Sequence, residues 1–136
     1  MKGCYILIIE LKDNITIQIG KIGNILFKKG FYTYIGSALN GLELRINRHL
    51  MKEKKICWHI DYLLQHGRII KIFYKENDKK EECSIAKKFE EKLLSISNFG
   101  CSDCKCNSHL FYGTLKDILY IVDKFNMNQY SLNAKI

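Results

Sequence analysis

The sequence contains no proline among its 136 residues. Turns fixed by proline are therefore excluded, and chain reversals must depend on glycine, asparagine and aspartate. It also has no apolar run near the ~20 residues needed to span a bilayer. The apolar run Cys4 to Ile9 is closed by Glu10 and is too short for the core of a signal peptide. These absences predict a cytoplasmic protein that does not bind membranes.

Acidic residues are few relative to basic ones: 14 Asp and Glu stand against 22 Lys and Arg, which gives a formal net charge of +8. Such a balance on a small domain favours an anionic partner, of which nucleic acid is the commonest, and DNA is favoured over RNA. The alternative is an ordinary lysine-rich surface, because many lysines lie in short runs such as Lys52 to Lys55. Charge alone does not decide between the two.

Length and a hydrophobic fraction of 47% suit one α+β domain, a small antiparallel or mixed β-sheet flanked by helices. Apolar alternation and helical periodicity place the elements. The strands are predicted at Gly3–Leu11, Ile15–Ile19, Gly30–Gly36, Arg68–Lys75 and His109–Tyr112, and the helices at Leu42–Leu50, Trp58–Leu64 and Glu82–Leu94, with a last one opened by Thr114. The single domain spans residues 1–125, with a core over 3–94, a Cys-rich loop over 98–109, a C-terminal helix over 114–125 and a loose tail over 126–136.

The helix predicted at Leu42–Leu50 carries Arg45 and His49 four positions apart, so both lie on one face, with Arg48 beside them. It follows directly on the tyrosine- and glycine-bearing segment Tyr34–Ala38. A strand with a phenol, a glycine turn and a helix with a guanidinium and an imidazole form a plausible cradle for a phosphate.

Phosphodiester hydrolysis requires a deprotonated water, neutralised transition-state charge and a stabilised leaving oxygen. A metal held by a carboxylate serves the last two needs, and an arginine fork serves the second. The chain offers each part: Tyr5 and Tyr34 on adjacent strands, Arg45 and His49 on one helix, and Glu82 at the start of a later helix.

These residues carry a resemblance to a known family. Gly3-Cys4-Tyr5 and Tyr34-Ile35-Gly36 resemble the two halves of the GIY-YIG nuclease signature. Arg45 followed by Arg48-His49 resembles the catalytic helix of that superfamily, and Glu82 lies where its metal-binding glutamate is expected.

The resemblance covers roughly residues 3 to 94. The two halves of the signature are further apart than is usual, which a hairpin inserted at residues 12 to 30 would explain. The chain is most similar to a little-characterised archaeal and bacterial branch with a Cys-rich C-terminal extension, sometimes fused to an endonuclease III-like domain. The segments that carry this closer resemblance are Gly36–Ala38, Trp58–Leu64, Glu82-Cys83, Phe99–Cys104 and Ser108–Leu110.

The resemblance implies a Mg²⁺- or Mn²⁺-dependent endonuclease that acts on DNA or structured nucleic acid in repair or processing. It implies that Glu82 holds the metal and that Arg45 clamps the scissile phosphate. Tyr5 would be the base or water-orienting group, Tyr34 would support it, and His49 would assist in proton transfer or phosphate binding. The predicted substrate-binding residues are Gly36, Ser37, Arg48, Lys54, Lys55 and His59.

Each of these residues also has a plainer interpretation. The tyrosines could simply pack the sheet. Arg45 and His49 could form an exposed amphipathic face, and Glu82 could be a helix N-terminal acid stabilised by the macrodipole. Glu81 is a competing metal ligand, and His59 could be a partly buried histidine rather than a site residue. Only the joint occurrence favours catalysis.

A second cluster comprises Cys101, Cys104, Cys106 and His109, four donors within nine residues. Cys-x-x-Cys is a usual step in zinc sites, so this loop is a candidate Zn²⁺ site, which Cys83 could complete in space. The alternative is a compact loop whose cysteines act as small apolar fillers.

Two further hypotheses remain open beside the nuclease. One is a nucleic-acid-binding module that lost turnover, and the other is a zinc-stabilised interaction domain in a repair assembly. A repair protein or a second copy of the chain would then be a partner, although no feature of the sequence requires a homodimer.

Overall fold

The computed structural model describes residues 2–77, 79, 81–100 and 106–132. It confirms the α+β class: the described chain forms four α-helices, a six-stranded antiparallel sheet and a separate two-stranded sheet. In chain order the elements are β1 (Gly3–Leu11), β2 (Ile15–Ile19), a short 3₁₀ turn (Gly20–Ile22), β3 (Gly23–Phe27), β4 (Gly30–Ala38), α1 (Leu42–Leu50), α2 (His59–Leu64), β5 (Arg68–Glu76), α3 (Glu82–Glu90), β6 (Leu94–Ser95), β7 (Leu110–Gly113), α4 (Leu115–Asp123) and β8 (Asn128–Tyr130).

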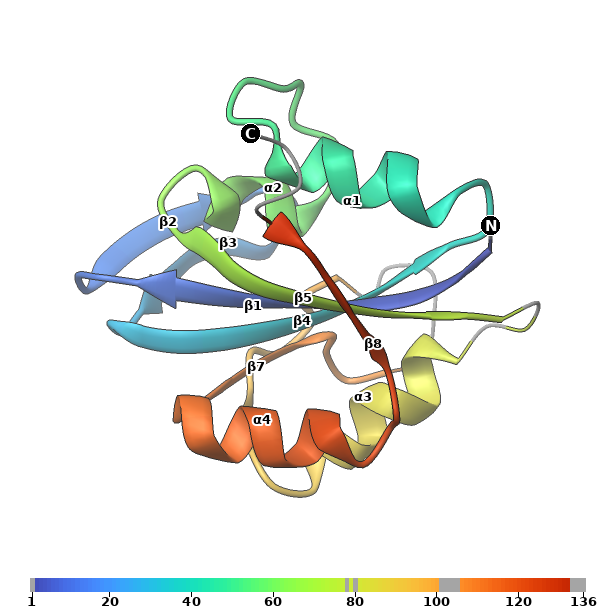
Figure 1. Ribbon diagram of the computed structural model, residues 1–136. Helices are drawn as coiled ribbons and strands as arrows, with labels where there is room; N and C mark the ends of the chain where they lie inside the picture. Colours follow the sequence, from blue (N-terminus) through green and yellow to red (C-terminus); the bar gives the residue numbers. More distant parts are fainter. Residues whose placement is uncertain (1, 78, 80, 101–105, 133–136) are drawn as a thin grey trace.

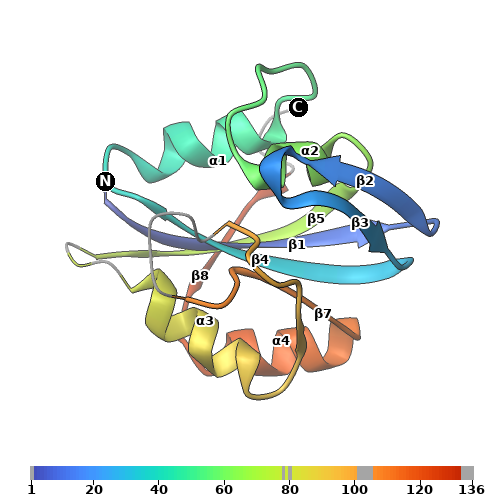
Figure 2. The same ribbon diagram turned by 180° about the vertical axis from the view of Figure 1, so that it is seen from behind.

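The large sheet has the strand order β6-β7-β4-β1-β5-β8, so β1 and β4 lie at its centre. Helices α1 and α2 and the β2–β3 hairpin cover one face, and α3 and α4 cover the other (Figures 1 and 2). The hairpin lies within residues 12 to 30, where the sequence predicted one, and β2 pairs with β3 rather than with β1. No helix in the described part of the chain is long and apolar enough to cross a membrane.

Strand β1 is buried on both of its faces, as a central strand covered by helices on both sides should be. Successive side chains of a strand point to opposite faces, so β1 contributes to two separate core clusters. Tyr5, Leu7, Ile9 and Leu11 belong to the cluster with α1 and α2, and Cys4, Ile6 and Ile8 belong to the cluster with α3 and α4. Cys4 is thus a buried strand residue, as predicted.

The helix predicted over Glu82–Leu94 ends at Glu90. The amide of Leu93 still donates to the carbonyl of Phe89 at 2.8 Å, and Leu93 packs into the core between α3 and α4. The next two residues, Leu94–Ser95, pair with β7 instead. Helical periodicity therefore placed Leu93 on the correct face, but strand pairing with a distant segment ended the helix early.

The loose tail expected over residues 126–136 is wrong for Asn128–Tyr130, which form β8 and pair with β5 at the edge of the sheet. The hydroxyl of Tyr130 lies 3.1 Å from Oδ1 of Asn47, and its ring packs against Tyr74. Residues 133–136 lie outside the described part. Cross-strand contacts rather than local propensity create this strand.

Two helices begin where side chains cap them. Thr114 caps α4 as predicted, because its Oγ1 accepts a hydrogen bond from the amide of Asp117 at 3.1 Å. Helix α2 begins one residue later than predicted, with Trp58 as its N-cap. The carboxylate of Asp61 accepts from the amide of Trp58 at 3.0 Å, which fixes the turn into α2.

Candidate active site

A cavity of about 510 Å³ gathers most of the predicted site residues. Its walls come from β1, β4, α1, the start of α2, α3 and the segments that precede α1, α2 and β7. The lining residues are Tyr5, Tyr34, Gly36, Ser37, Leu39, Asn40, Arg45, Cys57, Trp58, His59, Glu82, Cys83, Gly100 and His109. The structure therefore brings together Tyr5, Tyr34, Arg45 and Glu82 of the predicted catalytic set, and Gly36, Ser37 and His59 of the predicted binding set.

The position of Tyr5 depends on a glycine in the neighbouring strand. Tyr5 on β1 lies directly opposite Gly36 on β4. A Cβ atom at position 36 would lie 2.3 Å from Cζ of the Tyr5 ring, which is closer than any real contact. Glycine is therefore required there for the phenol to cross β4 and reach the cavity.

His49 lies behind Tyr5 rather than on the cavity wall, and its side chain is buried. Its Nε2 is 2.6 Å from the Tyr5 hydroxyl. Burial lowers the pKa of His49 to about 3, so the imidazole is neutral near pH 7. Burial also raises the pKa of Tyr5, an effect that the charge of Arg45 partly offsets. Both shifts oppose transfer of the phenol proton to the imidazole, so His49 holds the hydroxyl in place.

Tyr34 supplies a second phenol to the cavity. It is buried, and its ring meets those of His49 and Phe99 edge-on, each with the centroids 6.3 Å apart. Burial raises the pKa of Tyr34 well above 10, and the nearby Tyr5 raises it further. Tyr34 is therefore a neutral hydroxyl that can donate a hydrogen bond into the cavity.

Arg45 is half-buried on the cavity wall, and two contacts orient its guanidinium. Its Nη1 donates a hydrogen bond to the carbonyl oxygen of Ser37 at 3.1 Å. Its Cζ lies 4.4 Å from the centroid of the Trp58 ring, a cation–π distance. A guanidinium has five N–H donors, so further donors can bind an anion within the cavity.

Glu82 opens α3 and is only 8% exposed, while Ile85 and Phe89 face the core. Its Oε2 has no hydrogen-bond partner among the described residues. A buried carboxylate oxygen without a partner is costly, and a bound cation would offset that cost. Carboxylate oxygen is also the ligand that Mg²⁺ and Mn²⁺ prefer, so the residue fits the implied metal.

The competing carboxylate, Glu81, lies elsewhere. It is 32% exposed, and its Oε2 is 3.6 Å from Nζ of Lys75 on β5. It does not belong to the described lining of the cavity. Of the two adjacent acids, the structure therefore places Glu82 in the cavity.

Three predicted substrate-binding residues make structural contacts outside the cavity lining. Arg48 forms a bidentate ion pair with Asp61, with both N–O distances at 2.9 Å. Nζ of Lys54 donates to the carbonyls of Arg48, His49 and Met51 at the end of α1. The side chain of Lys55 is exposed, and its carbonyl accepts from Arg48 at 2.8 Å. The charged groups of Arg48 and Lys54 therefore hold the end of α1 and the segment after it, and do not line the cavity.

His59 is partly buried and also lines the cavity. The structure therefore agrees both with a partly buried histidine and with a residue at the site. Its Nδ1 accepts a hydrogen bond from the amide of Gly100 at 2.9 Å. Burial lowers the pKa of His59, so the ring stays neutral. The contact fixes which ring nitrogen is the acceptor and orients the ring at the wall.

A cluster that could hold a metal ion lies beside Glu82. The ligand atoms of Cys83, Cys106 and His109 all lie within 4.8 Å of one another. Sγ of Cys83 is 3.8 Å from Nε2 of His109, and both residues line the cavity. Cys101 and Cys104 of the predicted site lie outside the described residues. Cys83 is distant from the other two in sequence, and it is the residue that was expected to complete such a site in space.

Trp58 is a cavity residue that the sequence pattern did not select as a site residue. It is 39% exposed, unusual for a tryptophan, and Arg45 and Arg48 both stack on its ring. Its exposure could not be read from the sequence, because an apolar ring in a short helix is normally taken as core.

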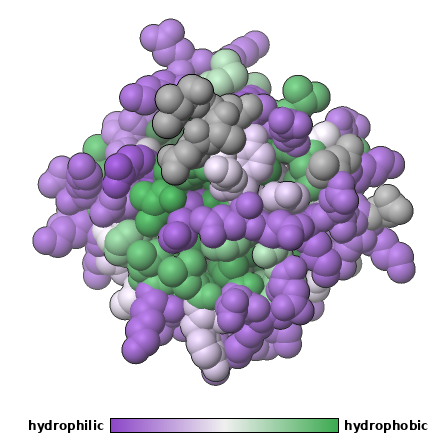
Figure 3. All heavy atoms as spheres, in the orientation of Figure 1, coloured by the Kyte–Doolittle hydropathy of each residue, from purple (hydrophilic) through white to green (hydrophobic). Residues whose placement is uncertain are grey.

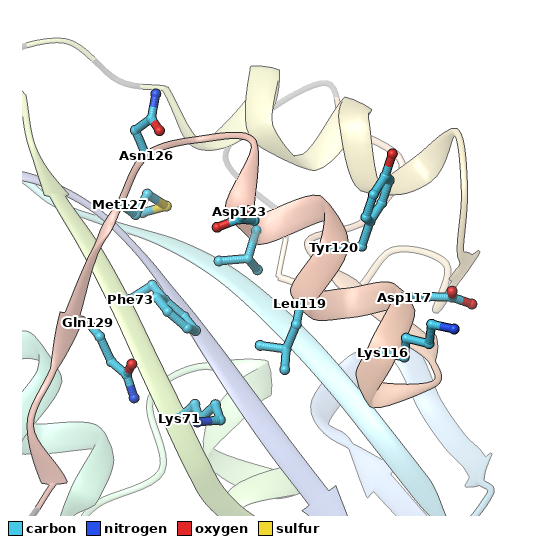
Figure 4. A pocket seen from close by; sticks show the side chains of 11 residues that line it. Lys71, Phe73, Lys116, Asp117, Leu119, Tyr120, Asp123, Asn126, Met127 and Gln129 are labelled. Carbon is cyan, nitrogen blue, oxygen red and sulfur yellow. The ribbon is translucent and has the colours of Figure 1, made fainter.

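A separate hollow of about 980 Å³ lies between α4, β5 and β8 (Figure 4). Phe73, Leu119 and Met127 line its floor, with Lys71 and Gln129 at its side. Apolar surface gathers on this face of the molecule (Figure 3). Its described lining holds none of the predicted site residues, so the two hollows are distinct.

Fold and site together define an α+β protein whose cavity combines two phenols, a guanidinium, a carboxylate and a neighbouring thiol–imidazole cluster. The chain belongs to the family described as domain of unknown function DUF123, which matches residues 4–128. No curated protein and no solved structure matches the chain significantly.

Proposed function

We propose that this protein is a metal-dependent endonuclease of the GIY-YIG type, which hydrolyses phosphodiester bonds in DNA or structured nucleic acid during repair or processing. The observation that carries the proposal is the single cavity shared by Tyr5, Tyr34, Arg45 and Glu82, which come from four different elements. The net charge of +8 suits a polyanionic substrate.

The residues have separable roles in this proposal. Arg45 binds the non-bridging oxygens of the scissile phosphate and neutralises the charge that develops on them. Tyr5, held by His49, orients the attacking water, and Tyr34 donates a hydrogen bond to the phosphate. Glu82 would hold Mg²⁺ or Mn²⁺, which when bound polarises the phosphoryl group and stabilises the leaving oxygen.

Cleavage assays on branched, nicked and linear DNA and on RNA, with Mg²⁺ or Mn²⁺, test the proposal. Arg45→Ala and Glu82→Gln should abolish cleavage, and Glu82→Gln should retain nucleic-acid binding. Glu81→Gln is the matched control for the carboxylate, and Arg68→Ala is the control for the charge, because Arg68 is exposed and pairs with Glu10. Both controls should cleave normally.

Two outcomes would contradict the proposal. Equal residual cleavage in all variants would indicate a contaminating nuclease. Binding without any cleavage in the unaltered protein would support the rival function, a nucleic-acid-binding module without turnover.

A second proposal concerns the Cys83–Cys106–His109 cluster, whose ligand atoms are of the kinds that bind zinc. We infer that Cys83, Cys106 and His109 bind Zn²⁺, because thiolate and imidazole are the donors that zinc prefers in structural sites. Elemental analysis of protein purified without chelator should find one zinc per chain. Absence of stoichiometric metal would contradict the assignment and leave the nuclease proposal untouched.

A further inference from the structure

We infer that the metal ion at the Cys83–Cys106–His109 cluster positions Glu82 in the cavity, so that loading of this cluster controls binding of the divalent cation there. The inference rests on the proposed function, because it takes Glu82 as the ligand of Mg²⁺ or Mn²⁺. Cys83, Cys106 and His109 are thus positioning residues that act through Glu82.

The first link is covalent. Cys83 follows Glu82 in the first turn of α3, and both side chains line the cavity. A planar peptide joins the two residues and leaves little freedom between them inside a helix. An ion that holds Sγ of Cys83 therefore restrains the backbone that carries the Glu82 carboxylate.

The second link anchors the cluster to the sheet. The amide of His109 donates to the carbonyl of Phe99 at 2.8 Å, and its carbonyl accepts from the amide of Ile35 at 3.0 Å. Ile35 lies on β4 between Tyr34 and Gly36. A metal bond to His109 thus ties the start of α3 to the strand that carries the other half of the cavity.

The distances suit one ion. Sγ of Cys83 and Nε2 of His109 are 3.8 Å apart, and the three ligand atoms lie within 4.8 Å of one another. In a tetrahedral zinc site with Zn–S of about 2.3 Å and Zn–N of about 2.0 Å, neighbouring ligand atoms lie roughly 3.5–3.8 Å apart. Only a small closure of the cluster is needed.

A metal bond would add to the one ion pair at the start of α3 in the described chain, between Glu81 and Lys75 at 3.6 Å. Glu81, the N-cap residue of α3, makes no side-chain capping hydrogen bond, and Oε2 of Glu82 has no partner within the described ranges. A buried carboxylate of this kind gains free energy by turning toward water. Ile85 and Phe89 anchor α3 through the core, but one and two turns further along the helix.

The test measures two metals on the full chain: zinc by elemental analysis and Mn²⁺ affinity by electron paramagnetic resonance. Cys83→Ser and Cys106→Ser should lose zinc and weaken Mn²⁺ binding about 10- to 100-fold, as outer-shell changes commonly do. Cys57→Ser is the matched control, because Cys57 lines the same cavity outside the cluster. It should keep both metals.

Further measurements separate positioning from unfolding. Cys83→His keeps a zinc donor and should restore Mn²⁺ affinity, and readdition of zinc to chelator-treated protein should do the same. Co²⁺ in place of zinc should give thiolate-to-metal absorption. Unchanged Mn²⁺ affinity after zinc removal, or absence of metal from the cluster, would overturn the inference.

The same data distinguish this inference from the proposed function. Glu82→Gln should lose Mn²⁺ but keep zinc, which supports two separate sites. If Mn²⁺ binding depends on zinc but no nucleic acid is cleaved, the inference stands and the nuclease proposal alone fails.

Discussion

The Tyr5 hydroxyl lies 2.6 Å from Nε2 of His49 and joins β1 to α1 across 44 positions of sequence. The imidazole is neutral because burial lowers the pKa of His49 to about 3. In the tautomer with the proton on Nδ1, Nε2 accepts from the phenol. This pair fixes the phenol at the cavity wall, and several predictions concern it.

Tyr5→Phe removes the hydroxyl and leaves Nε2 of His49 without its hydrogen-bond partner. We expect cleavage to fall on the order of 10²-fold, because the phenol no longer orients the attacking water. Unfolding should require about 1–3 kcal/mol less, the cost of an unsatisfied buried group. Cleavage rates and urea unfolding measure the two effects.

Tyr32→Phe is the control for that substitution. Tyr32 is equally buried, and its hydroxyl donates to the carbonyl of Lys28 at 2.6 Å, but it is not among the cavity residues. It should lose stability without losing cleavage. A similar loss of cleavage in both variants would show that the effect of Tyr5→Phe reflects folding alone.

Gly36→Ala tests the close approach of the Tyr5 ring to β4. The new methyl group would lie 2.3 Å from Cζ of Tyr5, so the ring must move. We expect a loss of about 1–3 kcal/mol in stability and a loss of cleavage, because overpacking displaces the phenol. Ser37→Ala, one position along, should leave stability nearly unchanged, since the hydrogen bond from Arg45 is to the Ser37 backbone carbonyl. Unimpaired cleavage by Gly36→Ala would contradict the role of Tyr5.

Asp61→Asn tests the buried ion pair that holds α1 against α2. Asp61 is fully buried, and its carboxylate binds Arg48 and the amides of Cys57 and Trp58. Removing one partner of such a pair should cost about 3 kcal/mol or more in thermal or urea unfolding. Glu10→Gln, which breaks an exposed pair with Arg68, should cost less than about 1 kcal/mol. Equal losses of stability in the two variants would contradict the structural role of the Arg48–Asp61 ion pair.

The buried His49 predicts a pH dependence of stability. Its pKa is lowered from 6.5 to about 3 in the folded state, so the unfolded chain binds the proton first as the pH falls. Stability should be full above pH 6.5 and decline below it by up to about 1.4 kcal/mol per pH unit. Urea unfolding at pH 7 and pH 5 should differ by about 2 kcal/mol on this account. His49→Gln should reduce the difference in unfolding free energy between the two pH values. An unchanged difference would contradict the role of His49 in this pH dependence.

The local elements could be predicted because their signals are local. A continuous apolar run predicted β1, and apolar–polar alternation predicted β2, both with their observed bounds. The segment that places Arg45 and His49 four positions apart was predicted as a helix and forms α1. Strand β8 and the early end of α3 could not be predicted, since both depend on pairing with strands far away in the sequence.

For the candidate site, the sequence indicated which residue types take part, but it did not show which basic residues lie in the cavity. The types and order of Tyr5, Arg45 and Glu82 suggested phosphate chemistry, and Arg48 was predicted to bind the substrate as well. The structure separated Arg45 in the cavity from Arg48 in an ion pair with Asp61, a partner 13 positions away.

The sequence by itself indicated most of the strands and helices and which chemical groups are available, because periodicity and residue type are local properties of the chain. Tertiary structure alone decided which of these groups face one cavity. It placed Cys83 beside His109, turned Lys54 onto the carbonyls at the end of α1, and left one oxygen of Glu82 unpartnered among the described residues. The physical reason is that such contacts depend on packing between elements remote in sequence, and local sequence patterns do not indicate that packing.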